Sequence, residues 1–463
     1  MELRDITPIP SVPSALIYPK KNRWKPVVLV VLIVATICVA FWYALPRMLS
    51  LFFSHDEQKI GNSDLLLHKV SIPDRNNGYF SVSKITDESV YLPDSNKSFD
   101  VDYTNYEKPV SWNQSLVDSV LLRNAQPLAA LSDAASESYF QFPKYADPAN
   151  LKADMELYPL NALRRLTRLQ AVKALSLARQ GKGSEALAEA AKLTVLGHHI
   201  IVGHNSLIGS LVGVATQRLG SETILQILQM SNPGKGALLN TLKKVEESSN
   251  TKEGYKDAFR FEYTYTLNSI DESVNAKLQE EIDAMAREGA ITHAVAKYAK
   301  HGYYYKPNQT KDLYTELYAR QLSFIGEQCV VGPDPELEHR RAVGWKLVFT
   351  ENAVGKLLFS ATGLSLGSVI AKQCQNDLAL NVAKAELGLY VYKIDHGVVP
   401  ASLDKIVPDY MPALPIDPYN KQPLHYNVKE KLLYSVGEKK QDVGGSVGDA
   451  WSTMENPSFR FSF

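Results

Sequence analysis

An apolar run near the N-terminus constrains this chain more than any other feature of its sequence. Residues 26–45 read PVVLVVLIVATICVAFWYAL and contain no charged side chain. A helix of that many residues is about 30 Å long, which is the thickness of the hydrocarbon core of a bilayer. Four lysines and arginines lie between positions 20 and 25, whereas only Arg47 follows the run closely. This pattern predicts a transmembrane helix at 26–45 with the N-terminus in the cytoplasm.

Two alternatives to a membrane anchor are a cleaved signal peptide and a buried core helix. A signal peptide has a shorter apolar core and small residues at its cleavage site, whereas this run ends in Phe41, Trp42 and Tyr43. A core helix seldom combines this length with basic flanks. We therefore expect a single-pass protein of the bacterial inner membrane, in contact with lipid through this helix. Its tail at 1–25 would be disordered, and its bulk would lie outside the cytoplasm.

The rest of the chain has the composition of a globular protein. Of its 463 residues 45% are hydrophobic and 22% are charged, which suggests two or three domains. The formal net charge is zero, so no field of one sign would attract nucleic acid. The three cysteines form no CxxC pair, which argues against a thiolate zinc site. Cys329 and Cys374 form either a disulfide or two separate buried thiols, and their spacing leaves both open.

Changes in hydrophobic period divide this remainder into three parts. Residues 46–110 contain alternating runs such as Tyr79–Val82 and Ser89–Leu92, which predict a juxtamembrane segment with a few short strands. Residues 111–375 have a helical period and predict a helical bundle or an irregular helical repeat, weakly similar to tetratricopeptide hairpins. Residues 376–463 predict a small α+β module. The overall fold class is therefore mostly α, with one transmembrane helix.

Several helices are expected within the helical region. One carries leucines spaced by three between 157 and 175 and ends at Gly181–Gly183. Ser184 begins a second helix, and a third runs over 205–230 until Asn232-Pro233-Gly234 stops it. Further helices are expected near 236–248, 253–288, 311–327, 336–358 and 376–396.

One sequence motif matches that of a serine hydrolase. Gly363-Leu364-Ser365-Leu366-Gly367 fits the GxSxG pattern, and Asp395 and His396 follow it in the chain. The pattern requires a strand before the serine, but the preceding chain has a helical period. The alternative is a small-residue link before a helix, which we favour, so Ser365 is not expected to be catalytic.

Two clusters of polar residues could each be either a functional site or a purely structural feature. His198, His199 and His204 lack the spacing of a known metal motif, so buried structural histidines are favoured over metal ligands. Acids at 257–290 could act in acid–base chemistry but are more typical of a solvated helix face. The aromatic side chains that alternate with them, from Phe259 to Tyr265, are expected in the core or lining a groove.

The C-terminal region contains an ordered series of motifs. A helix ending at Gly397 precedes a proline-rich stretch and then the corner Leu414-Pro415-Ile416-Asp417-Pro418-Tyr419. Alternation at 424–428 and at 432–436 predicts a β-hairpin, and Tyr434-Ser435-Val436-Gly437 leads into a loop with glycines and acids. Residues 376–455 resemble the globular domain of the major pseudopilin of type II secretion. Unlike a pseudopilin, this chain separates the module from its apolar helix by hundreds of residues.

The resemblance implies a calcium site in the last loop. Asp442 and Asp449, together with Ser435, match the positions of the ligands, and calcium prefers oxygen ligands. This loop offers few acids and also contains Lys439 and Lys440. For the whole chain we expect a non-enzymatic binding or scaffold protein of the cell envelope, with a protein partner and no nucleic acid. Alternatives are an extracytoplasmic hydrolase with an unrecognised site and an assembly factor linked to type II secretion.

Overall fold

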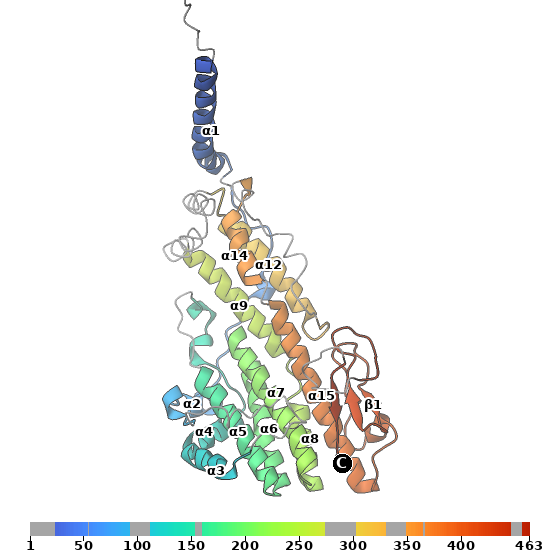
Figure 1. The fold of residues 1–463 in the computed structure, drawn as a ribbon. Coiled ribbons are helices and arrows are strands. Elements are labelled where there is room, and N and C mark those ends of the chain that lie inside the picture. The colour runs from blue at the N-terminus through green and yellow to red at the C-terminus, as the bar shows by residue number, and fades with distance from the viewer. Residues whose placement is uncertain are drawn as a thin grey trace, which may run out of the picture.

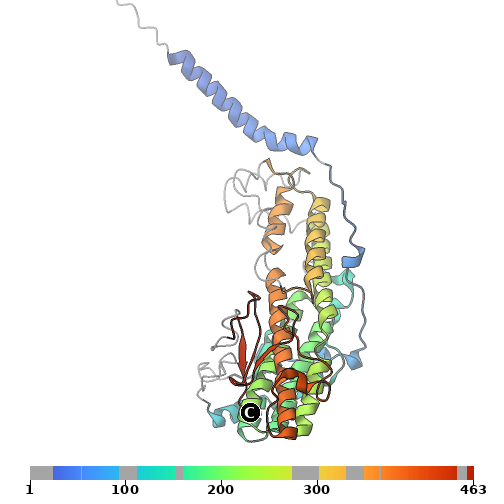
Figure 2. The same cartoon turned by 90° about the vertical axis from the view of Figure 1, so that its right-hand side faces the viewer.

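The computed structural model describes residues 24–53, 55–92, 112–152, 160–273, 302–329, 349–363, 366–445 and 456–463. Within these ranges the chain is mostly helical and contains a three-stranded sheet. Figures 1 and 2 show a tapered molecule in which α1 projects from the narrow end. Helices α2 to α8 and the C-terminal sheet form the wide end.

Helix α1, Trp24–Phe52, contains the apolar run. Among the described residues, no helical stretch combines the length and the hydrophobicity that crossing a bilayer requires. This finding overturns the predicted transmembrane helix at 26–45, together with the single-pass topology and the inner-membrane location derived from it.

Residues 55–92 form helical turns where strands were predicted. Tyr79–Val82 is the short helix α2, and Asp87–Ser89 is a 3₁₀ turn. The prediction of strands is wrong for these residues because a strand needs a neighbour to pair with, and among the described residues the backbone of 55–92 forms one isolated bridge, between Asn77 and Tyr139. Two further 3₁₀ turns are Ser63–Leu65 and Asp74–Asn76.

The predicted helices of the body are confirmed where the structure describes them. They are α5 (Leu160–Arg179), α6 (Gly183–Val202), α7 (Leu207–Met230), α8 (Lys235–Glu247), α9 (Lys252–Ser273) and α12 (Pro307–Phe324). Helices α3 (Gln114–Arg123) and α4 (Ala125–Ser136) pack at the wide end, and α14 spans Ala353–Gly363. Most of the helix predicted at 336–358 lies outside the described residues.

Glycine allows α6 and α7 to approach each other closely. A Cβ atom at Gly197 would lie 2.4 Å from the backbone nitrogen of Gln217, and one at Gly220 would lie 2.6 Å from that of Thr194. Both distances are too short for a side chain, so α6 and α7 pack backbone to backbone. This contact fixes the position of the polar side chains of α7 that face α15.

Helix α15, Leu366–His396, joins the helical body to the C-terminal region. Most of its side chains are buried, because one side packs on α7 and α8 and another on residues 403–411 and 416. A helix that is buried on all sides must lie inside a core. The same hydrophobic cluster includes Leu225 of α7 and Phe459 of the sheet. The predicted boundary at 375/376 therefore falls within one helix and one core.

The predicted β-hairpin is confirmed. Strand β1 (His425–Asn427) pairs antiparallel with β2 (Leu432–Tyr434), and Tyr426 lies opposite Leu433. A third strand that was not predicted, β3 (Ser458–Arg460), pairs antiparallel with β2 on its other edge. It brings the C-terminal Phe463 onto Tyr390 of α15, with the two rings stacked at 4.5 Å between centroids.

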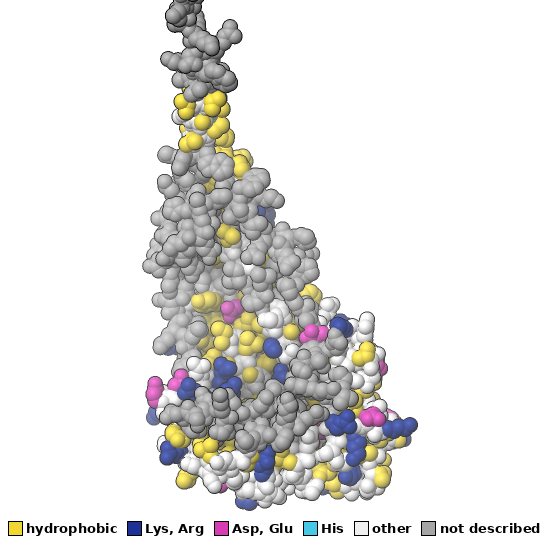
Figure 3. Space-filling view, in the orientation of Figure 1, with side chains coloured by type: hydrophobic (Ala, Val, Ile, Leu, Met, Phe, Trp, Pro, Cys, Tyr) yellow, Lys and Arg dark blue, Asp and Glu magenta, His cyan; other side chains and the backbone are white. Residues whose placement is uncertain are grey.

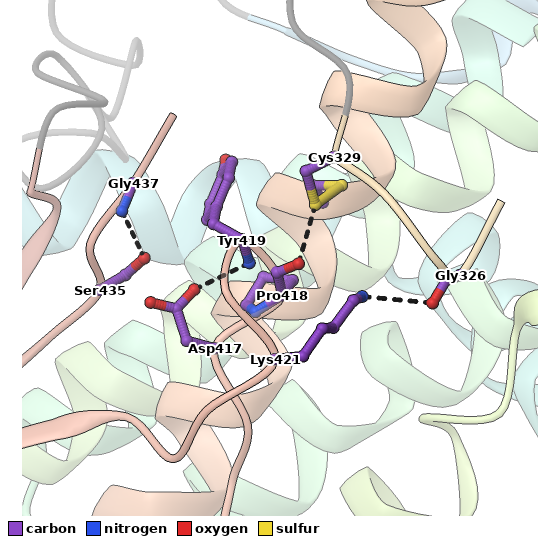
Figure 4. The surroundings of a disulfide bond; sticks show 9 residues. Gly326, Cys329, Asp417, Pro418, Tyr419, Lys421, Ser435 and Gly437 are labelled. Carbon is purple, nitrogen blue, oxygen red and sulfur yellow. Dashed lines mark hydrogen bonds between the residues drawn. A yellow bond between two sulfur atoms is a disulfide. The ribbon is translucent and has the colours of Figure 1, made fainter. Parts of the chain in front are cut away.

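Cys329 and Cys374 form a disulfide, which is one of the two alternatives that their spacing left open. Cys329 follows α12 and Cys374 lies in α15, and their Cα atoms are 5.9 Å apart. Both residues are buried, and the Cys329 sulfur lies 3.1 Å from the carbonyl oxygen of Pro418. The bond therefore lies where the α12 region, α15 and the C-terminal corner meet (Figure 4).

Candidate functional site

The hydrolase motif has a helix where catalysis would need a strand. Helix α14 ends at Gly363 and α15 begins at Leu366, while Ser365 itself lies outside the described residues. Asp395 and His396 lie at the far end of α15, about 45 Å along the helix from its start. Asp395 accepts hydrogen bonds from Lys235 and Tyr410 instead.

His198 and His199 have rings 5.9 Å apart, and His204 lies in a different environment. The Nδ1 atom of His204 lies 2.9 Å from a carboxylate oxygen of Asp257. His198 and His199 are largely buried in α6, and burial lowers the pKa of both, to about 4 for His199. Within the described ranges, no group of three or more His, Cys, Asp or Glu side chains is placed to hold a metal ion.

The described part of the acidic stretch 257–290 lies within α9. Asp257 is paired with His204 and with Arg260, and burial raises the pKa of Glu262. Phe259 and Phe261 are core residues, as expected. Residues 274–301 lie outside the described part of the chain.

The predicted calcium ligands form local turns. Buried Ser435 accepts a hydrogen bond from the N–H of Gly437, at 2.9 Å. Asp442 accepts one from the N–H of Gly444, and its other oxygen lies 3.4 Å from His425 Nδ1. Asp449 lies outside the described residues, so the calcium site stays a prediction.

A polar cleft that the sequence analysis did not predict lies next to the disulfide. It has a volume of about 260 Å³ and lies where four segments meet. These are residues 249–252 before and at the start of α9, Gly326 after α12, the 373–384 part of α15, and the corner 416–421. Three lysines line it, so we call it the lysine cleft: Lys252, Lys384 and Lys421.

Each lysine of the cleft already has one partner. Lys252 pairs with Glu327 at 2.6 Å, and the largely buried Lys384 pairs with Glu246 at 3.2 Å. Lys421 has no carboxylate partner among the described residues and donates to the carbonyl oxygen of Gly326 at 3.2 Å. Glu327 and Glu246 do not line the cleft, so its lining carries three ammonium groups and one carboxyl group, and Lys421 is the lysine among them that has no carboxylate within ion-pair distance among the described residues.

Asp377 is the acidic side chain of the lysine cleft. Burial raises its pKa to about 7, although the ammonium groups of Lys421 and Lys384 oppose that increase. Its carboxylate accepts no hydrogen bond from a described residue, and hydrogen bonds would otherwise stabilise the ionised form. A group that titrates near neutral pH within a cleft is typical of a functional site.

A buried polar network supports the wall of the cleft formed by α15. Asn376, next to Asp377, donates to Gln217 of α7 at 2.7 Å and to the hydroxyl of Tyr255 in α9 at 3.2 Å. Gln217 in turn donates to the carbonyl oxygen of Ser248, directly before the 249–252 wall. Buried amide networks of this kind fix one arrangement of the elements that they join.

Buried Asp417 shapes the corner that carries Lys421. One carboxylate oxygen accepts the N–H of Tyr419 at 3.0 Å, and the other accepts the N–H of Val436 at 2.8 Å. The corner is thereby connected to the end of β2, and Figure 4 shows it beside the disulfide. Asp417 thus belongs to the support of the cleft wall and not to its lining.

We expect Asp417→Ala to lower the free energy of unfolding by about 2–3 kcal/mol, because two buried N–H groups lose their acceptor. Asp417→Asn should lose about half as much, since only one of its two side-chain atoms accepts hydrogen bonds. Urea denaturation of the two variants measures this order. Exposed Asp409→Ala is the control, and equal stability of Asp417→Ala and this control would contradict the assignment.

The residues of the lysine cleft gave little signal in the sequence. They come from segments about 170 positions apart and form no motif. The spacing of Asp377 and Lys384, seven residues apart, places both on one face of a helix. That spacing is equally typical of a solvated helix face, so it could not single out a site.

Comparisons with known proteins add no assignment. No protein-family model matches this sequence, and neither the curated proteins nor the solved structures contain a significant match to it. The resemblance to pseudopilins and the weaker one to tetratricopeptide hairpins therefore stay predictions from the sequence.

Proposed function

We infer that this chain is a non-enzymatic binding protein and that the lysine cleft is its ligand site. The observation that carries this inference is the convergence of four segments on one cleft whose walls are held in place by a disulfide and by buried polar contacts. The disulfide holds the Gly326 wall, the Asn376 network holds the α15 wall, and Asp417 holds the corner. A site whose walls are fixed before binding loses little entropy when a ligand enters.

The size of the cleft favours a small molecule as its ligand. Drug-sized ligands occupy pockets of about 300–1,000 Å³, and this cleft is slightly smaller. Its walls carry amide and hydroxyl groups besides the charged ones, from Gln373, Asn381, Ser249 and Thr251. Such groups orient a polar solute by hydrogen bonds. A protein partner, which the sequence analysis expected, and a link to type II secretion, which it gave as an alternative, remain separate proposals.

The binding function is tested by thermal unfolding of the purified chain with four small solutes. Succinate, inorganic phosphate, spermidine and glucose differ in charge, and one that binds the folded state raises the melting temperature. We expect at least one of them to do so. Asn250→Trp, at the rim of the cleft, should abolish the increase by occupying the space.

Asn150→Trp is the matched control, because Asn150 is also an exposed asparagine and lies outside the cleft. It should leave the increase unchanged. The proposal fails if none of the four solutes raises the melting temperature, or if Asn250→Trp still shows the full increase.

Acid–base catalysis is a second candidate function, favoured by the pKa of Asp377. A general base works best when its pKa lies near the working pH, and that of Asp377 is about 7. This would correspond to the hydrolase alternative of the sequence analysis. The two functions predict different fates for a bound solute. Recovery of the unchanged solute after prolonged incubation supports binding. Conversion of the solute by the wild type, but not by Asp377→Asn, supports catalysis.

A further inference from the structure

The charges of the lysine cleft indicate which class of ligand it takes. Its walls carry three ammonium groups and one carboxyl group. Lysine is a flexible point charge that binds carboxylate and phosphate oxygens. We propose that the lysine cleft binds a small dianion, with Lys421 and Lys384 contacting its charged oxygens. This inference deepens the proposed binding function and rests on it.

Lys421 is the lysine most available to such a ligand. Its ammonium group donates to one backbone carbonyl, of Gly326, and an ammonium group has three donors. Lys384 of α15 is largely buried, and its ammonium group lies 3.2 Å from a carboxylate oxygen of Glu246. Both lysines act on the charge of Asp377, so the two ammonium groups and that carboxyl group share one region of the cleft.

The start of α9 adds to the positive character of the cleft. This helix of 22 residues begins at Lys252, in the wall of the cleft. The N-terminus of a helix carries partial positive charge and unpaired N–H groups, which favour anions. This effect supplements the lysines and would not define a site without them.

Protonation of Asp377 should tune the affinity for an anion. Among the described residues, Lys384 on its own helix and Lys421 on the corner act on Asp377, Lys252 at the start of α9 lines the same cleft, and Arg218 of α7 donates to Gln375 nearby. Glu246 and Glu327 pair with two of these lysines, and the hydroxyls of Tyr255 and Tyr419 lie near and stay neutral because burial raises their pKa. As the pH rises through about 7, Asp377 gains a negative charge that repels the ligand.

Isothermal titration of the full chain with succinate and with inorganic phosphate tests this proposal and separates the two dianions. We expect at least one of them to bind to the wild type. Its affinity for Lys421→Met or for Lys384→Met should be about tenfold lower, because each variant loses a charge-assisted hydrogen bond to the ligand. Wild-type affinity for succinate, which stays a dianion over this range, should fall several-fold between about pH 6.5 and about pH 8.5, and Asp377→Asn should remove most of that fall.

Lys431→Met is the matched control. Like Lys421, Lys431 has a positive φ and donates to a backbone carbonyl oxygen, that of Phe463, but it lies outside the cleft. It should bind as the wild type does. Unchanged affinity in Lys421→Met and Lys384→Met, or binding of neither dianion, overturns the proposal. If spermidine or glucose binds and Asn250→Trp abolishes that, the dianion is wrong while the binding function stands.

Discussion

Replacing both Cys329 and Cys374 by serine is expected to lower the free energy of unfolding by about 4 kcal/mol. The bond joins residues 45 positions apart. Closing a loop of that length restricts the unfolded chain, and the entropy removed corresponds to about 4 kcal/mol at 25 °C. Both sulfur atoms lie in a buried environment, where two hydroxyl groups would replace them at a further cost.

Urea denaturation of the oxidised wild type, the reduced wild type and the double variant measures this effect. Reduction alone isolates the contribution of the bond, because it leaves both side chains as thiols. Cys38→Ser is the control, since Cys38 is exposed and forms no disulfide. Oxidised and reduced wild type with the same urea midpoint would show that the bond does not stabilise the fold.

Reduction of the disulfide should also affect the proposed binding function. Gly326 lies three residues before Cys329 and provides both a wall of the lysine cleft and the acceptor for Lys421. Reduction should loosen this wall before the whole chain unfolds, because local openings cost less than global ones. A ligand of the cleft should therefore bind more weakly to the reduced protein under native conditions.

Helices were the part of the fold that local sequence patterns predicted well. The period of apolar residues and the Gly181–Gly183 turn located α5 and α6, and Asn232-Pro233-Gly234 located the end of α7. The β-hairpin was likewise predicted, because alternation on both sides of a short turn is a local signal. Strand β3 was missed because its pairing with β2 joins residues that lie far apart in the sequence, such as Tyr434 and Ser458.

Predictions that depended on environment were less successful. Tyr79–Val82 alternates like a strand, but no neighbouring strand is present among the described residues to pair with it. The apolar run at 26–45 met every local criterion for a membrane span, and the structure does not support that assignment. The lysine cleft arises from tertiary packing of four distant segments, so no local pattern could have located it.

The buried Glu386 leads to the second large prediction. It lies in the middle of α15 with about 1% of its surface exposed, and neither carboxyl oxygen has a hydrogen-bond partner among the described residues. Burial therefore raises its pKa well above the usual range. An ionised carboxylate without a partner is among the most destabilising groups that a core can contain.

The sign of the pH dependence follows from proton binding. Above the ordinary pKa of glutamate, about 4.3, the unfolded chain releases this proton while the folded chain retains it. The folded state then binds more protons than the unfolded state, so stability falls as the pH rises. The decrease is about 1.4 kcal/mol per pH unit, and it continues until the pH passes the raised pKa of the folded protein.

Glu386→Gln should remove this loss, because glutamine has the same shape and does not ionise. We expect the variant to match the wild type near pH 4 and to be more stable at higher pH, by about 1.4 kcal/mol for each pH unit up to the raised pKa of the folded wild type. Glu386→Leu should show the same pH dependence, which separates the effect of charge from that of hydrogen bonding. Urea denaturation across this pH range measures both variants.

Glu247→Gln provides the matched control. Glu247 lies in α8, its side chain is 63% exposed, and its carboxylate is 3.8 Å from Lys243. Removing this charge should change stability little at any pH, because exposed ion pairs contribute at most about 1 kcal/mol. A constant difference between Glu386→Gln and the wild type from acid to alkaline pH would mean that Glu386 ionises normally in the folded protein. The α15 core would then contain a charge whose partner lies outside the described residues.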